Sequence, residues 1–204
     1  MSYETRYGIY LRPDPATCWA VTQITQALRA QFGIVSASAF PPHATLIGNL
    51  ATDATVSEII DALTPVFAAT RTFTVYNKGV VVHGDGFEYD INLSADLDSV
   101  NTQLSGLAQE VKRAILSLSR PVDDFLVTPV VDYEFAGHLG LASHDLMVDN
   151  HLTEEVGDFI ADLPIAVPSS FEARWFSLFE FRADWNSHWW KDMSWRHMMS
   201  WQSH

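Results

Sequence analysis

Hydrophobic and polar residues alternate along residues 6–12 (RYGIYLR), a pattern typical of a half-buried strand. Pro13 and Pro15 end this strand and can open a helix in its first turn. Apolar residues then recur at helical spacing over 16–32, and Gly33 is placed to end this helix. The pattern that follows predicts a short strand after His43, a helix at 56–68, and strands at 72–76, 79–82 and 87–93, the last two joined by a turn at 84–86.

The second half of the chain opens with its longest periodic segment. The spacing predicts a helix over 96–118, which Asp96 or Ser94 can cap. Its apolar positions form one stripe, made of Leu97, Val100, Leu104, Leu107, Val111, Ile115 and Leu118. A linker with two prolines then leads to a short strand that begins at His138. The remaining pattern predicts a helix at 153–163 and strands at 171–175 and 176–181.

The order of the predicted elements repeats along the chain. Strand, helix, histidine-bearing strand, helix and hairpin occur twice, and Phe73 follows His43 at about the same distance as Phe171 follows His138. We therefore expect an α+β fold in which residues 1–204 form a single domain of two pseudo-symmetric lobes, a bilobed duplicated fold. Each lobe should have a mostly antiparallel sheet with outer helices, and the two should enclose a central groove. The alternative is an ordinary α+β chain that alternates by chance.

Composition and charge limit the classes of function. Apolar residues make up 48% of the 204 positions, enough for a substantial core. Acidic residues outnumber basic ones 25 to 12, which disfavours a protein that grips long nucleic acid through its phosphates. No apolar run approaches the roughly 18 residues of a membrane-spanning helix, and no signal peptide is recognised at the start. We expect a cytoplasmic protein without a membrane partner; the sequence does not indicate its oligomeric state, although a monomer is favoured.

Cysteine and tryptophan carry two further interpretations. Cys18 is the only cysteine, so no internal disulfide can form and cysteine-rich zinc sites are excluded. We interpret it as a small buried hydrophobe, with nucleophilic use as the alternative. Tryptophans gather near the C-terminus, where they predict an apolar plug or, alternatively, a platform for base stacking. They are Trp175, Trp185, Trp189, Trp190, Trp195 and Trp201.

The sequence His43-Ala44-Thr45-Leu46 places two polar side chains together. Residues i and i+2 of a strand share a face, so the His43 imidazole and the Thr45 hydroxyl point the same way. This pair suits a phosphate, because one group can move a proton while the other donates a hydrogen bond to a non-bridging oxygen. A lone histidine beside a strand is more often structural.

A second histidine occupies the equivalent place in the other half. His138 follows Phe135 by three residues, as His43 follows Phe40, and each histidine begins a strand. Two histidines related by a pseudo-twofold axis would approach one groove from opposite sides. One can then deprotonate the attacking oxygen while the other protonates the leaving oxygen, since an ordinary pKa of about 6.5 suits both tasks. Which histidine is acid and which is base is not indicated by the sequence.

With these two motifs the chain resembles the 2H phosphoesterase superfamily, whose mark is a pair of H-x-[ST]-apolar motifs in a bilobed, duplicated fold. The resemblance spans nearly the whole chain. It implies His43 and His138 as the catalytic pair, Thr45 as a phosphate ligand, and neither metal nor cofactor. It also implies metal-independent hydrolysis of a 2′,3′-cyclic phosphate, on a small phosphate-bearing substrate or an RNA end.

The second motif departs from the family pattern at Gly140, where a hydroxyl is expected. The contact could come from the Gly140 backbone N–H, from Ser143 or from His144. Losing one hydrogen bond to a charged oxygen costs on the order of 1.5–3 kcal/mol, which slows an enzyme without silencing it. The alternative function is a nucleotide or RNA-end binding module with weak or lost catalysis.

The sequence gives weaker support for a role of other residues in the site. Tyr10 and Arg12 share one face of the first strand, where Tyr10 could stack on substrate and Arg12 could pair with phosphate or remain solvated. His151 also begins an H-x-T sequence, although Thr153 is better placed to cap the next helix. Histidines 138, 144 and 151 match no standard metal-site spacing. The remaining histidines, His83, His188, His197 and His204, are expected at the surface or the rim.

Overall fold

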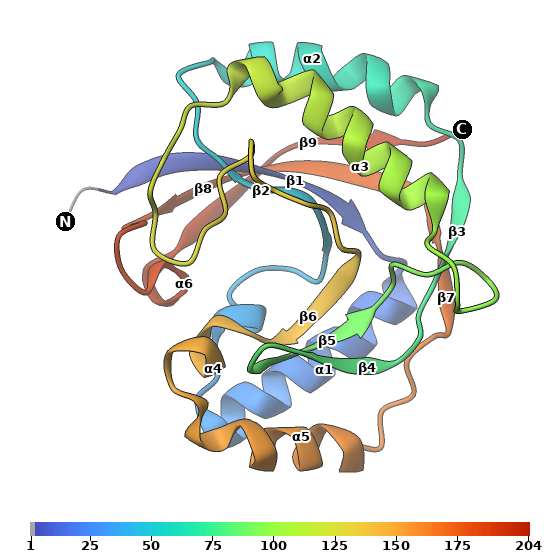
Figure 1. Ribbon diagram of the computed structural model, residues 1–204, viewed down its shortest axis with the longest axis vertical. Helices are drawn as coiled ribbons and strands as arrows, with labels where there is room; N and C mark the ends of the chain where they lie inside the picture. The colour runs from blue at the N-terminus through green and yellow to red at the C-terminus, as the bar shows by residue number, and fades with distance from the viewer. Residues whose placement is uncertain (1–2) are drawn as a thin grey trace.

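The computed structural model describes residues 3–204 (Figure 1), so residues 1 and 2 of the predicted domain lie outside the described part. The strands are β1 Glu4–Arg12, β2 Ala44–Leu50, β3 Phe73–Tyr76, β4 Val80–His83, β5 Gly86–Asp90, β6 His138–Ala142, β7 Ser170–Ala173, β8 Trp175–Ala183 and β9 Ser194–Gln202. The α-helices are α1 Pro15–Phe32, α2 Val56–Ala69, α3 Thr102–Ile115, α4 His144–Val148, α5 Thr153–Asp162 and α6 Trp189–Asp192. Short 3-10 helices lie at Ser36–Ser38, Leu116–Leu118 and Asn150–Leu152. No helix in residues 3–204 is both long and apolar enough to cross a membrane.

The strands form three antiparallel sheets. The first has the order β2-β1-β8-β9, the second β4-β5-β6, and β3 pairs with β7 in a third. The predicted α+β class with mostly antiparallel sheets is confirmed. The prediction of a second hairpin from 171–175 and 176–181 is wrong, because β7 pairs with β3 whereas β8 pairs with β1 and β9. The hairpin in this part of the chain is β8–β9.

Helices cover the outer faces of the two larger sheets. Two of them, α1 and α3, each pack on a different sheet from the one that contains the strand before them. α1 follows β1 of the first sheet but packs against β6 of the second, beside α5. α3 follows β5 of the second sheet but packs against β2 of the first, beside α2. Figure 1 shows α2 and α3 together on one side of the molecule, with α1 and α5 together on the other. Each lobe is thus built from both halves of the sequence.

Local signals explain where the helices begin and end. Asp14 accepts a hydrogen bond from the Thr17 backbone N–H at the start of α1, and Gly33 ends that helix in the left-handed conformation at φ 71°. Thr55 and Glu58 form a reciprocal capping box at the start of α2. These helices therefore lie within one residue of the ranges that the sequence predicts.

The helix predicted over 96–118 begins later than expected. Asn101 caps α3 by accepting from the Leu104 N–H, whereas the Asp96 carboxylate accepts from the backbone N–H groups of residues 98 and 99. That turn competes with the helix. Leu97 consequently adopts φ 58° and is exposed, as is Val100, so neither residue belongs to the apolar stripe.

The tryptophans near the C-terminus divide into two groups. Trp185, Trp190 and Trp201 are buried, and their indole N–H groups donate to the Glu4 carbonyl, the Asp145 carboxylate and the Thr64 hydroxyl, respectively. These three residues are buried as an apolar plug requires, but Trp201 belongs to the main core and Trp185 to a separate cluster with Tyr10 and Phe40, so they do not form one plug. Trp195 on β9 is 43% exposed and is not part of it.

Candidate active site

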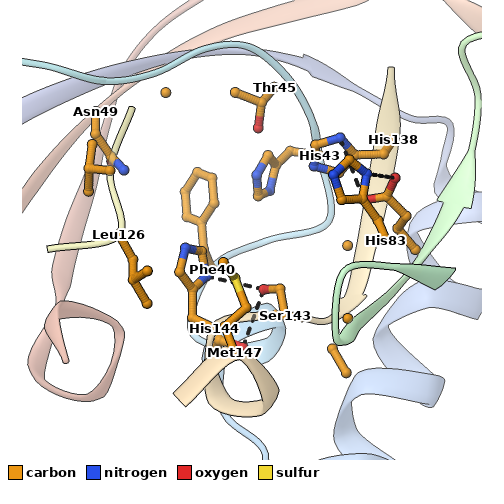
Figure 2. Close-up of a pocket in the computed structure, with 18 of the residues that line it drawn as sticks. Phe40, His43, Thr45, Asn49, His83, Leu126, His138, Ser143, His144 and Met147 are labelled. Atoms are coloured by element: carbon orange, nitrogen blue, oxygen red, sulfur yellow. Dashed lines mark hydrogen bonds and ion pairs between the residues drawn. The ribbon is translucent and has the colours of Figure 1, made fainter. Parts of the chain in front are cut away.

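A cavity of about 370 Å³ lies between the first and second sheets. Its walls come from β2 and β6, from the segments that precede these strands, and from residues 126–128 of the connection between α3 and β6. Figure 2 shows Thr45 and the rings of His43 and His138 around this cavity. The structure thus brings both predicted histidines and the predicted phosphate ligand to one place.

His43 directly precedes β2 and is held by one hydrogen bond. Its Nδ1 lies 2.8 Å from the Pro41 carbonyl oxygen, which can only accept, so Nδ1 carries the proton and Nε2 is left as an acceptor. The ring packs against Tyr10 and Phe40 at centroid distances of 4.5 and 4.6 Å. Burial lowers the pKa of His43 from 6.5 to about 4, with a smaller contribution from His138 in the same direction. At neutral pH the His43 ring is therefore uncharged.

His138 is held in the same way in the second lobe. It is the first residue of β6, and its Nδ1 lies 2.9 Å from the carbonyl oxygen of Ala136, two residues earlier. Each histidine therefore donates Nδ1–H to the carbonyl at position i−2 and leaves Nε2 without that partner. The equivalence that the sequence suggested in the Phe-x-x-His spacing extends to the hydrogen bond that orients each ring.

The two lobes differ at the positions that follow the histidines. Thr45 pairs across the sheet with Tyr10, whereas Gly140 pairs with Glu88, and all four residues line the cavity. A Cβ atom added at Gly140 would meet no atom within 4 Å. The first lobe therefore presents a hydroxyl where the second has open space and a neighbouring carboxylate.

Tyr10 and Arg12 take different places, although both lie on β1. Tyr10 lines the cavity but is 5% exposed and packs against His43, and burial raises its pKa. Arg12 is not among the cavity residues. Its guanidinium lies 5.1 Å from the ring centroid of Trp175, its partner in the β1–β8 pairing. The structure therefore does not bring Arg12 to the phosphate position that the sequence analysis considered.

Ser143 and His144 lie at the far end of β6. Ser143 Oγ is 3.1 Å from His144 Nδ1 and 3.5 Å from Ser36 Oγ, and all three residues line the cavity. Burial lowers the pKa of His144, whose ring packs on Trp189 and Trp190. Ser143 thus presents a hydroxyl to the cavity, as the sequence analysis considered.

His151 lies outside the cavity and contacts Asp149 on the surface. It is an exposed residue in a 3-10 turn, so the structure gives it no place opposite His43. Thr153 is the first residue of α5 and makes no capping hydrogen bond, since Leu152 occupies the cap position. In residues 3–204 no three His, Cys, Asp or Glu side chains are grouped so that they could hold a metal ion.

Sequence reasoning missed Glu88, His83 and Tyr133 as cavity residues. Glu88 Oε2 lies 3.8 Å from His138 Nδ1, and Glu88 Oε1 lies 3.5 Å from His83 Nδ1. The Tyr133 hydroxyl donates to the Thr45 carbonyl, and burial, with a smaller effect of Glu88, raises the Tyr133 pKa to about 12. Glu88 is brought beside Gly140 only by the pairing of β5 with β6, which the sequence does not show. The one signal in the sequence was that Glu88 alternates with buried residues on the predicted strand.

Hydrogen bonds hold the connection between α3 and β6 beside the cavity. Asp124, 7% exposed, accepts two hydrogen bonds of 3.1 Å from the guanidinium of Arg6, which is 1% exposed. The next residue, Phe125, donates its N–H to the Trp185 carbonyl and accepts from the Trp189 indole. These bonds hold Leu126 and its two successors at the cavity wall.

No protein-family model matches the chain, and no curated protein matches its sequence. Solved structures do match it over nearly its full length. Escherichia coli LigT in complex with NADP+ is 12% identical, covers 99% of each chain and gives a TM-score of 0.56. LigT with 3′-AMP is 14% identical, with 98% of each chain covered and a TM-score of 0.54. The protein TT0787 of Thermus thermophilus is 12% identical over 97% of each chain, with a TM-score of 0.59.

Another match, described as a phosphoesterase, covers 98% of this chain at 14% identity with a TM-score of 0.54. Identities this low establish the architecture rather than the chemistry. The resemblance drawn from the two histidine motifs is confirmed at that level. The chain has the α+β fold of the 2H phosphoesterases.

Proposed function

We propose that the protein is a metal-independent phosphodiesterase that opens a 2′,3′-cyclic phosphate on a nucleotide or an RNA terminus. The observation that carries this proposal is the equivalent arrangement of His43 and His138, each with Nδ1 on the carbonyl at i−2 and both on one cavity. Two imidazoles with one ring nitrogen free can act together as general base and general acid. The ligands named for LigT, 3′-AMP and NADP+, support a small phosphate-bearing substrate.

The protonation of His43 suggests how the roles divide during hydrolysis. Because burial keeps His43 uncharged at neutral pH, its Nε2 accepts a proton from water as the water oxygen bonds to phosphorus. The bond from phosphorus to the 2′ or 3′ oxygen breaks, and protonated His138 delivers a proton to that oxygen. Thr45 donates a hydrogen bond to a non-bridging oxygen. In the reverse direction the two histidines exchange roles.

His138 has a neighbour that suits the acid role. The Glu88 carboxylate lies 3.8 Å from its Nδ1, so the positive charge of a general acid at this position would have a negative partner nearby. His43 has two aromatic rings around it and no carboxylate in contact among the described residues. The difference between the two surroundings supports His43 as the general base and His138 as the general acid.

A binding module of the same fold is the second candidate. The missing hydroxyl at Gly140, together with the carboxylate beside it, favours this function, because both weaken the hold on a phosphate in the second lobe. Such a module would recognise a nucleotide or an RNA end without efficient turnover.

A screen of 2′,3′-cyclic nucleotides separates the two candidates. The wild-type protein should hydrolyse at least one of them in the presence of a chelator, and His43→Ala or His138→Ala should lower kcat/KM at least about a hundredfold. His151→Ala removes a histidine outside the cavity and should leave turnover unchanged. Binding without product would favour the module, and loss of turnover on adding chelator would overturn the metal-independent mechanism.

A further inference from the structure

Glu88 is an unusual residue for a cavity that is proposed to hold a phosphate. Its side chain is 17% exposed and faces the space opened by Gly140, its partner across β5 and β6. Directly paired residues of neighbouring strands have their side chains on the same face of the sheet. The carboxylate therefore stands beside the position where the second lobe lacks a hydroxyl.

Few positive charges are available to neutralise this carboxylate. Among the described residues no lysine or arginine pairs with Glu88, and its two histidine contacts, at 3.5 and 3.8 Å, are longer than hydrogen bonds. No lysine or arginine is among the cavity residues either. The titratable side chains that line the cavity are those of Tyr10, His43, His83, Glu88, Tyr133, His138 and His144.

The charge of a phosphate ligand depends on its esterification. A phosphodiester carries one negative charge, whereas a monoester with a second pKa near 6 carries almost two at pH 8. Proteins that bind the doubly charged form usually supply arginine or lysine. Here the additional charge would meet a carboxylate instead.

We infer that Glu88 is a specificity-determining residue, which makes the cavity accept singly charged phosphodiesters and reject doubly charged phosphomonoesters. The inference rests on the proposed function and adds to it the charge class of the ligand. Opening a cyclic diester with water yields a monoester, so the carboxylate repels the doubly charged product more strongly than the singly charged substrate. Glu88 thereby favours product release and protects the enzyme from inhibition by nucleoside monophosphates.

A matched pair of ligands tests this inference without any reaction. 2′-Deoxyadenosine 3′-monophosphate and its methyl diester differ by about one charge at pH 8, and neither can cyclise because the 2′ hydroxyl is absent. Titration calorimetry should show that the wild-type protein binds the diester at least about tenfold more tightly. Glu88→Gln should tighten the monoester about a hundredfold and the diester about tenfold, because the electrostatic energy scales with the ligand charge, so that the tenfold preference disappears.

Glu172→Gln is the matched control. Glu172 lies on β7 outside the cavity, where it accepts from the Thr74 hydroxyl, so its replacement removes the same charge from a protein of formal charge −13. Both affinities should then stay within about twofold of wild type, because surface charges are largely screened. Circular dichroism and thermal unfolding establish that both variants are folded.

Several outcomes would overturn the inference. They are equal binding of monoester and diester by wild type, no measurable binding of either, or an equal effect of Glu88→Gln on both. The proposed function fails separately, if wild type turns over no 2′,3′-cyclic phosphate. A selectivity that depends on Glu88 without turnover would uphold the inference and leave a binding module. Turnover without that selectivity would uphold the proposed function and overturn the inference about Glu88.

Discussion

The surroundings of His43 predict a specific pH dependence of stability. The ring packs between Tyr10 and Phe40, and burial lowers its pKa from 6.5 to about 4. In the unfolded chain the imidazole regains its ordinary pKa. Between pH 6.5 and 4 the unfolded state therefore binds more protons than the native state, and native stability falls as the pH falls through this window.

The size of the effect follows from the two pKa values. At pH 5 the unfolded imidazole is almost fully protonated and the native one is largely neutral, which costs the native state about 2 kcal/mol relative to pH 7. The loss approaches about 3 kcal/mol below pH 4. Burial lowers the pKa of His144 as well, so this residue adds a change of the same sign. The comparison must therefore be made between wild type and a variant that lacks only the His43 ring.

Urea unfolding of wild type and His43→Gln at pH 5, 6 and 7 measures this difference. The free energy of unfolding should fall by about 2 kcal/mol less in the variant than in wild type between pH 7 and 5. His204→Gln is the control, since the His204 ring is exposed and its replacement should leave the slope unchanged. Parallel pH profiles for wild type and His43→Gln would refute the argument that burial keeps His43 neutral.

Three further substitutions test other parts of the structure. Gly140→Thr should raise kcat/KM for a cyclic phosphate about fivefold, since the added side chain has room and restores a hydrogen bond of about 1 kcal/mol; loss of activity in a folded variant would show that substrate approaches the backbone there. Thr45→Ala should lower the same quantity about fivefold or more, and an unchanged value would remove Thr45 from the proposed site. Arg6→Ala should lower the free energy of unfolding by about 3–5 kcal/mol in urea, because it leaves Asp124 buried without its partner; a loss below about 1 kcal/mol would contradict that role.

The sequence predicts most of the elements because their periodicity is strong. α1 and α2 have clear caps and apolar spacing, and Pro13 follows the last residue of β1. The phenylalanine three residues before each histidine also marked equivalent positions in the two halves. His43 precedes β2 and His138 begins β6, and both strands face one cavity. The hydrophobic alternation on these two strands indicated the placement of the histidines.

Other features depend on contacts that no single segment encodes. β9 escaped prediction because residues 194–197 are exposed on both faces, so no alternation marks this strand. The start of α3 was misplaced because the local turn at Asp96 competes with an apolar spacing that would fit a helix. Glu88 was missed because its importance comes from the pairing of β5 with β6, and pairing partners are not visible in a linear pattern.

The pairing of β1 with β8 also constrains how the chain reaches its native state. Glu4 lies opposite Ala183, and Arg12 opposite Trp175, so the contacts of this pair join positions about 170 residues apart. Pairings of such high contact order form slowly. At roughly 5–20 residues per second, synthesis of the intervening chain takes on the order of 10–30 s, during which β1 has no partner from β8.

β1 lies between β2 and β8 in the first sheet, and α3 covers this sheet. The early part of the chain therefore cannot complete the first sheet while the ribosome is still adding β8. The first sheet is therefore expected to form only after β8 has been synthesised, with β1 accessible to chaperones until then. A fragment that ends before β8 should lack the folded first sheet, even though it would contain both histidines.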